Sequence, residues 1–284
     1  MLRRLIAFCV LGISAALASQ VETVHFQSED RQTRLVGYLF LPETAGPHPA
    51  IVLLHGRAGA YSSLANGVYT AETLSKRHKQ WGHFWADRGY VALLVDSFGP
   101  RGYPAGFPVG SYKDRPAAVS EQTVRPLDAY GALRYLRSRR DIAPDRIGVQ
   151  GWSNGAMTVL VTMSQDAPGI PNPTRETGFR VALAEYPGCG MDAIKGEYRP
   201  YAHLLITVGT ADEEVSPKIC ESFADRAKRG GADLDLIIFE GAEHNYDDPS
   251  SKKQSNPADE RATEETMRRA ERLFREALVR ANTP

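Results

Sequence analysis

The residues with the clearest chemical potential are Gly151, Ser153 and Gly155, which form the pattern G-x-S-x-G after the apolar residues 147–149. A serine hydroxyl is a weak nucleophile unless a sharp turn holds it exposed beside a base. Flanking glycines remove the side chains that would clash in such a turn. N–H groups at the start of a following helix stabilise developing negative charge. The pattern predicts a nucleophilic serine on a strand–turn–helix elbow, and an ordinary strand–helix turn is the alternative.

An acid and a histidine follow this serine in chain order. Asp212 comes directly after the strand-like residues 203–210, and His244 follows the strand-like residues 234–239. In an open parallel sheet the carboxyl ends of the strands meet at one edge, and active sites form there. The order Ser153, Asp212, His244 is the order found in α/β-hydrolases, so we predict a catalytic triad.

A second motif, HGRAG at residues 55–59, follows the fully apolar residues 50–54. In an α/β-hydrolase, the loop after this strand donates one backbone N–H to the oxyanion, and the residue after the nucleophile donates the other. The predicted oxyanion hole therefore consists of the backbone amides of Arg57 and Asn154. We expect His55 to orient the loop by hydrogen bonding, with a role as a second base as the alternative.

Several carboxylates compete for the role of the triad acid. Glu213 and Glu214 directly follow Asp212, which we prefer because it comes first after the preceding strand. Asp247 and Asp248, just after the histidine, are expected to be solvated turn residues. Chemistry of the Ser–His–Asp type requires neither a metal ion nor an organic cofactor, so none is predicted.

Five segments together resemble the dienelactone hydrolase family. They are HGRAG (55–59), DSFGPRG (96–102), GWSNG (151–155), GTAD (209–212) and EH (243–244). The resemblance covers nearly all of the chain after residue 20, and it implies an α/β-hydrolase that cleaves a carboxylic ester or a lactone. The enzyme that names the family has a cysteine nucleophile and an acidic residue in its first oxyanion loop. This chain carries Ser153 and Gly56 there, so the resemblance implies conventional serine chemistry.

The substrate pocket is expected to include Trp152, Arg101 and Tyr103. Trp152 adjoins the elbow, and Arg101 is a candidate for binding an anionic group of the substrate, with a structural ion pair as its alternative. Tyr103 begins a loop, residues 103–119, that is rich in glycine and proline and is a candidate cap over the site.

Two other functions share these sequence features. Peptidases and amidases of the prolyl-oligopeptidase type have the same fold and the same triad order. A binding protein that uses a hydrolase scaffold without catalysis belongs to a different class. We prefer an esterase because the triad is complete, and because no additional propeller domain or specificity-determining acid is evident.

The elements that must position these residues alternate along the chain. Residues 21–27 and 34–41 alternate polar and apolar side chains, which predicts an antiparallel edge pair. Further strands are expected at 50–54, 90–96, 147–150, 180–187, 203–210 and 234–239, and helices at 70–87, 123–139, 156–163, from 217 and from 256. This pattern predicts an α/β fold with a mostly parallel sheet of about eight strands, helices on both faces, and a single domain over residues 19–284.

Residues 1–18 predict a secretory signal peptide. A basic start is followed by the apolar residues 5–17 and an A-x-A cleavage site at 16–18. The apolar run is shorter than the roughly 20 residues that a membrane span needs. The chain has 34 Lys and Arg against 34 Asp and Glu. This balance indicates no nucleic-acid or anionic-membrane partner, so we expect a small-molecule ester or lactone substrate and a periplasmic or secreted location.

Removal of the signal peptide leaves two of the three cysteines, Cys189 and Cys220. Exported proteins with two cysteines usually pair them. The two cysteines flank the loop that carries Asp212, so a disulfide between them is predicted to hold this loop in place. Two unpaired buried thiols are the alternative. The segments around the two cysteines, 186–189 and 217–220, also resemble an exported branch of the dienelactone hydrolase family, and this resemblance supports the pairing.

Overall fold

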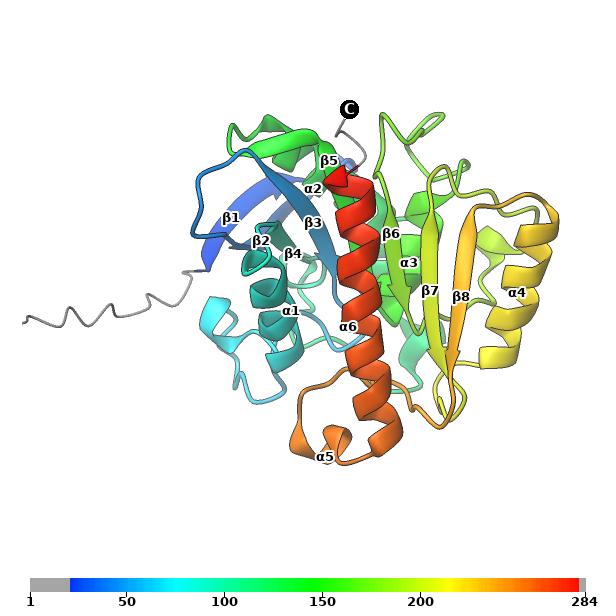
Figure 1. Cartoon of the computed structure of the whole chain (residues 1–284). Helices are drawn as coiled ribbons and strands as arrows, with labels where there is room; N and C mark the ends of the chain where they lie inside the picture. The colour runs from blue at the N-terminus through cyan, green and yellow to red at the C-terminus, as the bar shows by residue number, and fades with distance from the viewer. Residues whose placement is uncertain (1–20, 281–284) are drawn as a thin grey trace, which may run out of the picture.

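The computed structural model describes residues 21–280, and the predicted signal peptide lies outside the described residues. Its central feature is an eight-stranded sheet in the order β1-β2-β4-β3-β5-β6-β7-β8 (Figure 1). The strands are β1 Glu22–Gln27, β2 Arg34–Phe40, β3 His48–Leu54, β4 Val91–Asp96, β5 Ile142–Trp152, β6 Ala182–Glu185, β7 Leu204–Gly209 and β8 Leu234–Phe239. β2 pairs antiparallel with β1 and β4, and all other neighbouring strands are parallel. The predicted sheet and its antiparallel edge pair are confirmed.

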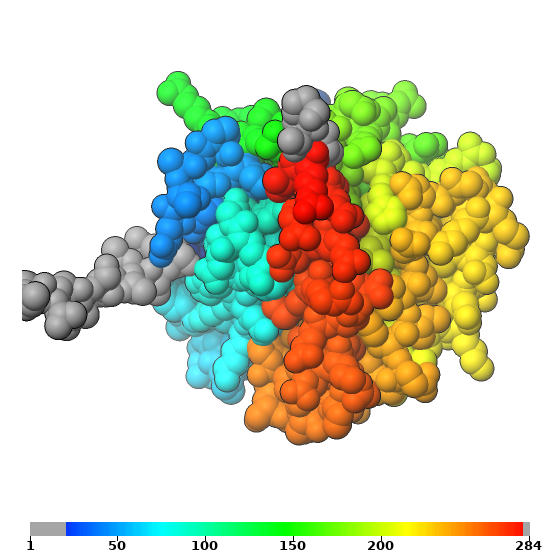
Figure 2. All heavy atoms as spheres, viewed as in Figure 1, coloured from blue at the N-terminus to red at the C-terminus, as the bar shows by residue number. Residues whose placement is uncertain are grey.

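Helices cover both faces of this sheet, as predicted. They are α1 Lys76–Ala86, α2 Arg125–Ser138, α3 Asn154–Met163, α4 Pro217–Arg229, α5 Ser251–Gln254 and α6 Pro257–Leu278. The buried residues of α2, α3 and α4 pack in one core cluster, and those of α1 and α6 pack in the other. In the space-filling view, α6 occupies the middle of its face, between the segments that carry α1 and β8 (Figure 2).

The continuous apolar sequence of the central strands follows from this two-sided cover. In β3, Ala50, Val52 and Leu54 belong to the core cluster on one face of the sheet. Ile51 and Leu53 belong to the cluster on the other face. Since successive side chains of a strand point to opposite faces, a strand that is covered on both faces must be apolar at every position.

Local capping sets the start of α1, which begins at Lys76 and not near residue 70 as expected. The Ser75 hydroxyl accepts a hydrogen bond from the backbone N–H of His78 at 3.3 Å, and residues 71–73 form a separate 3-10 turn. A serine cap of this kind satisfies one of the free N–H groups at a helix start. Across residues 21–280, none of the helices combines the length and the apolar character needed to cross a membrane.

Candidate active site

The G-x-S-x-G segment forms the predicted strand–turn–helix elbow between β5 and α3. Ser153 has φ 51° and ψ −114°, a region that non-glycine residues rarely occupy. A Cβ atom on Gly155 would lie 1.9 Å from the Leu54 carbonyl oxygen, and one on Gly151 would lie 2.5 Å from the Gly155 carbonyl oxygen. Glycine is required at both positions because backbone atoms meet there directly.

The three predicted triad residues lie together at the carboxyl ends of β5, β7 and β8. The His244 Nε2 atom is 3.0 Å from Ser153 Oγ, and its Nδ1 atom is 2.8 Å from Asp212 Oδ2. The other oxygen of Asp212 accepts backbone N–H groups at 2.9 and 2.8 Å. An Nδ1–H that donates to Asp212 leaves Nε2 free to accept the serine proton, which is the tautomer a general base needs.

The HGRAG loop lies directly against the elbow. A Cβ atom on Gly56 would be 3.3 Å from the Trp152 carbonyl oxygen and 3.5 Å from Ser153 Cβ. Arg57 is the next residue after Gly56 in this loop, and Asn154 is the first residue of α3 after Ser153. Both residues line a cavity that also reaches Ser153.

His55 has the structural surroundings that the sequence suggested. Its Nε2 atom accepts the backbone N–H of Ser97 at 3.2 Å, and its Nδ1 atom lies 2.8 Å from the Gly56 carbonyl oxygen. Burial, followed by the positive charge of Arg125, holds the pKa of His55 well below its ordinary value. The buried, neutral His55 imidazole thereby joins the 55–59 loop to the segment after β4.

A comparison with known protein families matches the dienelactone hydrolase family over residues 35–278, which is most of the chain. The chain belongs to the dienelactone hydrolase family. As a member of this family, the protein is a hydrolase that acts on ester bonds, as the sequence motifs implied.

Individual relatives of this family member are distant. A Bradyrhizobium sp. protein named "Probable 2-oxo-3-(5-oxofuran-2-ylidene)propanoate lactonase" is 23% identical over 218 residues, 74% of this chain and 78% of that protein. A structure assigned to dienelactone hydrolase from Klebsiella pneumoniae has a TM-score of 0.68 at 14% identity, over 90% of this chain and 98% of that chain. The butyrate-bound esterase Est2 from Thermogutta terrifontis has a TM-score of 0.61 at 20% identity, over 90% and 94%. At these identities the structural matches support the fold.

In this family member the carboxylate of Glu214, which the sequence offered as an alternative acid, has another place. Its two oxygens accept hydrogen bonds from the Arg57 side chain at 2.6 and 3.0 Å, and one lies 3.7 Å from His244 Nε2. Burial acts to raise the pKa of Glu214, but the Arg57 hydrogen bonds and the nearby positive charges lower it below its usual range. Glu214 is therefore an ionised carboxylate near His244 Nε2, whereas Asp212 is hydrogen-bonded to Nδ1.

We expect Glu214→Gln to move the acid limb of the kcat/KM pH profile to lower pH by about 0.5 unit. The carboxylate favours the protonated imidazole, which cannot act as a base, and the carboxamide does not. The substitution also leaves the Arg57 charge uncompensated, which acts in the same direction. The measurement is kcat/KM for a neutral ester between pH 4 and 9, where the ester itself does not ionise.

Glu213→Gln is the matched control for this prediction. The Glu213 carboxylate accepts the backbone N–H of His244 at 3.3 Å and does not pair with Arg57. It lies on the same loop as Glu214, so both substitutions remove one negative charge from the same segment. An equal shift in the two variants would show that the proximity of Glu214 to Nε2 has no special effect.

The three residues expected in the substrate pocket do not line the two cavities beside Ser153. Trp152 is fully buried, and its ring packs 6.0 Å from that of Trp81 in the core under α1. Arg101 is held in ion pairs with Asp128 at 2.8 Å and with Asp30 at 3.0 Å, so the structural alternative describes it. Tyr103 packs on the next aromatic ring of its loop at 5.3 Å. Sequence proximity to the motifs gave no indication of where these side chains point.

The second half of the loop of residues 103–119 does approach Ser153. Val109, Tyr112 and Arg115 line one cavity that reaches Ser153. Arg115 donates hydrogen bonds to the Asn154 side-chain oxygen at 2.8 Å and to Glu121 at 3.0 Å. The loop is thereby fixed to the first residue of α3 and forms one wall of the site.

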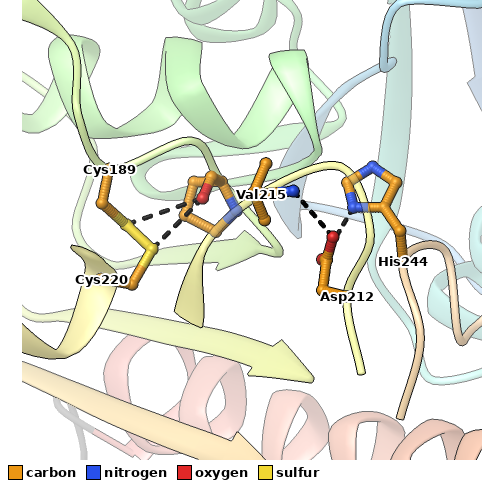
Figure 3. The surroundings of a disulfide bond; sticks show 6 residues. Cys189, Asp212, Val215, Cys220 and His244 are labelled. Atoms are coloured by element: carbon orange, nitrogen blue, oxygen red, sulfur yellow. Dashed lines mark hydrogen bonds and ion pairs between the residues drawn. A yellow bond between two sulfur atoms is a disulfide. The ribbon is translucent and has the colours of Figure 1, made fainter. Parts of the chain in front are cut away.

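The predicted disulfide between Cys189 and Cys220 is present (Figure 3). It joins the loop after β6 to the first turn of α4, and Asp212 and Val215 lie in the segment between them. Figure 3 shows Val215 between the disulfide and the Asp212–His244 pair. The backbone N–H of Val215 donates to Asp212, so the disulfide fixes the segment that orients the acid.

Replacing both cysteines by alanine is expected to lower the free energy of unfolding by about 3 kcal/mol, because the cross-link closes a loop of roughly 30 residues in the unfolded chain. Urea denaturation of the oxidised wild type and the double variant measures the difference. Dithiothreitol should lower the stability of the wild type towards that of the variant and leave the variant unchanged. Equal unfolding midpoints without reductant would contradict the stabilising role of the disulfide.

The expectation that Asp247 is a solvated turn residue is wrong. Asp247 is buried, and it accepts hydrogen bonds from Trp81 Nε1 at 2.9 Å and from the Tyr186 hydroxyl at 2.5 Å. The Arg77 guanidinium lies 3.2 Å from the same carboxylate. The Tyr186 ring packs edge-on against His244 with centroids 4.8 Å apart. Asp247 therefore anchors the aromatic ring that supports the histidine.

Proposed function

We propose that this family member is a serine esterase that cleaves a carboxylic ester or a lactone through an acyl-enzyme. The observation that carries the proposal is the continuous hydrogen-bonded chain from Ser153 Oγ through His244 to Asp212. The serine stands on a strained elbow at the start of a helix, beside a base that a buried carboxylate orients. This arrangement is the one that activates a serine hydroxyl.

In the acylation half, Ser153 Oγ attacks the carbonyl carbon of the ester while His244 Nε2 takes the hydroxyl proton. The negative charge moves to the carbonyl oxygen, where the backbone N–H groups of Arg57 and Asn154 stabilise it. Each such donor contributes about 3 kcal/mol to lowering the barrier. His244 then protonates the leaving alkoxide oxygen, the C–O bond breaks, and the acyl group remains on Ser153.

In the deacylation half, a water molecule takes the place of the alcohol. His244 removes one proton from the water, and the resulting oxygen attacks the acyl carbon. The second tetrahedral intermediate collapses with Ser153 Oγ as the leaving group, which receives the proton from His244. The free acid leaves, and the serine and histidine return to their starting protonation states.

The test combines covalent labelling with turnover. A fluorophosphonate probe should label the wild-type protein, and peptide mass spectrometry should place the label on Ser153. p-Nitrophenyl acetate should be hydrolysed, and faster than the anilide with the same acyl group. Efficient cleavage of the anilide would instead indicate the alternative peptidase or amidase activity. A wild-type protein that the probe does not label would refute the nucleophile.

We also propose that the protein acts outside the reducing cytoplasm, in the periplasm or secreted. The buried disulfide supports this location, since cytosolic thiols are kept reduced. Cell fractionation followed by N-terminal sequencing tests it. A mature chain that starts at Ser19 in the exported fraction is the expected result, and an uncleaved chain in the cytoplasm would contradict it.

A further inference from the structure

We propose that the Arg57–Glu214 ion pair divides the active-site cleft into two compartments. We further propose that these compartments select open-chain esters of an apolar acid with a polar, hydroxyl-bearing alcohol. The inference rests on the proposed esterase function and names the substrate class of the same site. It depends on the positions of two cavities relative to Ser153 and His244.

The first cavity, here the acyl compartment, has a volume of about 480 Å³. Its lining includes Ser153 and Asn154 together with the apolar or aromatic side chains of Val109, Tyr112, Met157, Met191 and Val215. The charged side chains in the same lining already have partners: Arg57 pairs with Glu214, Arg115 pairs with Glu121, and Glu213 accepts the His244 backbone N–H. His244 does not line it. A methionine-lined wall of this kind adapts its shape to an apolar chain. The cavity therefore suits the part of the ester that stays on the serine.

The second cavity, here the leaving-group compartment, has a volume of about 530 Å³ and is lined by Ser153 and His244. An alkoxide can leave only where His244 Nε2 can protonate it, so the alcohol must lie on this side. Beside charged and apolar side chains, the lining offers hydroxyl and amide groups that can hydrogen-bond an alcohol, at Ser62, Ser63, Ser75, Asn245 and Ser250.

The charged groups of the leaving-group compartment are mostly compensated. Arg77 is paired with Asp248 at 3.4 Å, and Lys253 is paired with Glu243. Lys76 is exposed to solvent. A neutral alcohol that carries several hydroxyl groups, such as glycerol or a sugar, therefore matches this lining better than an alkyl alcohol or a dianion.

The Arg57–Glu214 pair marks the boundary between the compartments. Arg57 and Ser153 line both cavities, Glu214 lines only the acyl compartment, and His244 lines only the other. An open-chain ester places its two halves on opposite sides of this boundary. A small lactone keeps the carbonyl carbon and the leaving oxygen in one ring, so it fills one compartment only and gains less binding energy.

The test compares three substrates of matched acid length: monoglyceryl hexanoate, propyl hexanoate and a six-carbon lactone. We expect kcat/KM to be about tenfold higher for the glyceryl than for the propyl ester, as one or two additional hydrogen bonds would give. The lactone should be the slowest of the three. Equal rates for the two esters, a faster propyl ester, or a lactone that matches the glyceryl ester would overturn the inference.

A matched pair of variants assigns each preference to its cavity. Val109 and Leu64 are 65% and 80% exposed, and each lines the rim of one compartment, so a larger side chain at either position does not disturb the core. Val109→Trp should lower kcat/KM for hexanoyl relative to acetyl esters and leave the glyceryl-to-propyl ratio unchanged. Leu64→Trp should change the glyceryl-to-propyl ratio and leave the acyl-length preference unchanged.

The assignment of the two preferences to the two cavities would be overturned if Val109→Trp changed the glyceryl-to-propyl ratio and Leu64→Trp the acyl-length preference. It would also be overturned if both variants changed the same preference. The proposed function itself fails in a different way. If the wild type hydrolyses no ester and the fluorophosphonate probe labels nothing, the esterase proposal falls, and the compartment inference falls with it. A labelled, active enzyme without the expected preferences overturns the compartments alone.

Discussion

Ser153→Ala is expected to lower kcat/KM for p-nitrophenyl acetate by at least about 10⁴-fold, because the covalent route is lost and only weak stabilisation by the oxyanion donors remains. The variant should bind substrate as the wild type does, since the acyl and leaving-group compartments are unchanged. Steady-state kinetics, with active-site titration of the wild type, gives the ratio.

Two further variants sharpen this prediction. Ser153→Ala combined with His244→Ala should be no slower than either single variant, because residues that act as one unit are not additive. Ser62 also lines the leaving-group compartment, but its hydroxyl accepts a hydrogen bond from the Leu64 backbone N–H. The Ser62→Ala variant should therefore still react with the fluorophosphonate probe. If Ser153→Ala retained more than a hundredth of the wild-type activity, another nucleophile would have to be sought.

Asp247→Ala is expected to reduce the free energy of unfolding by about 3 kcal/mol, the usual cost of removing one partner of a buried ion pair. Arg77, whose side chain is 13% exposed, would lose its closest carboxylate. The Trp81 N–H and Tyr186 O–H groups would also lose their acceptor. Burial raises the pKa of Tyr186 well above its ordinary value, so its hydroxyl remains a donor across the accessible pH range. Urea denaturation measures the loss.

Asp248→Ala is the control for this second prediction. Asp248 is the next residue in the chain and pairs with the same guanidinium at 3.4 Å, but its side chain is 39% exposed. A partly exposed pair contributes about 1 kcal/mol or less, so we expect a small change in stability. Similar decreases in the free energy of unfolding for the two variants would show that the burial of Asp247 does not determine its contribution to stability. Reduced activity of folded Asp247→Ala would show in addition that Tyr186 supports His244.

The parts of the site that the sequence predicted are those that chain order and strand ends determine. Ser153, Asp212 and His244 each follow an apolar strand, and parallel strands bring their carboxyl ends to one edge wherever the loops go. The structural need for glycine at positions 151 and 155 was equally predictable, because the elbow leaves no room for side chains there. The disulfide followed from cysteine count and compartment.

The parts that the sequence did not predict depend on side-chain direction. Trp152 directly precedes Ser153, yet it ends strand β5 and its side chain is buried in the core. Glu214 and Asp247 each have an acidic neighbour in the chain, Glu213 and Asp248, whose surroundings differ from their own. Only the three-dimensional positions of Arg57 and Arg77, distant in sequence, show which carboxylate of each pair has a partner.

The backbone conformation of Ser153 has an evolutionary consequence. A non-glycine residue in such a conformation costs the folded state about 1–3 kcal/mol, and glycine would remove most of this strain. A library of position-153 variants that is selected for thermal survival alone should therefore enrich glycine and discard the nucleophile. Under the proposed function, only selection for turnover would retain a serine at this strained position.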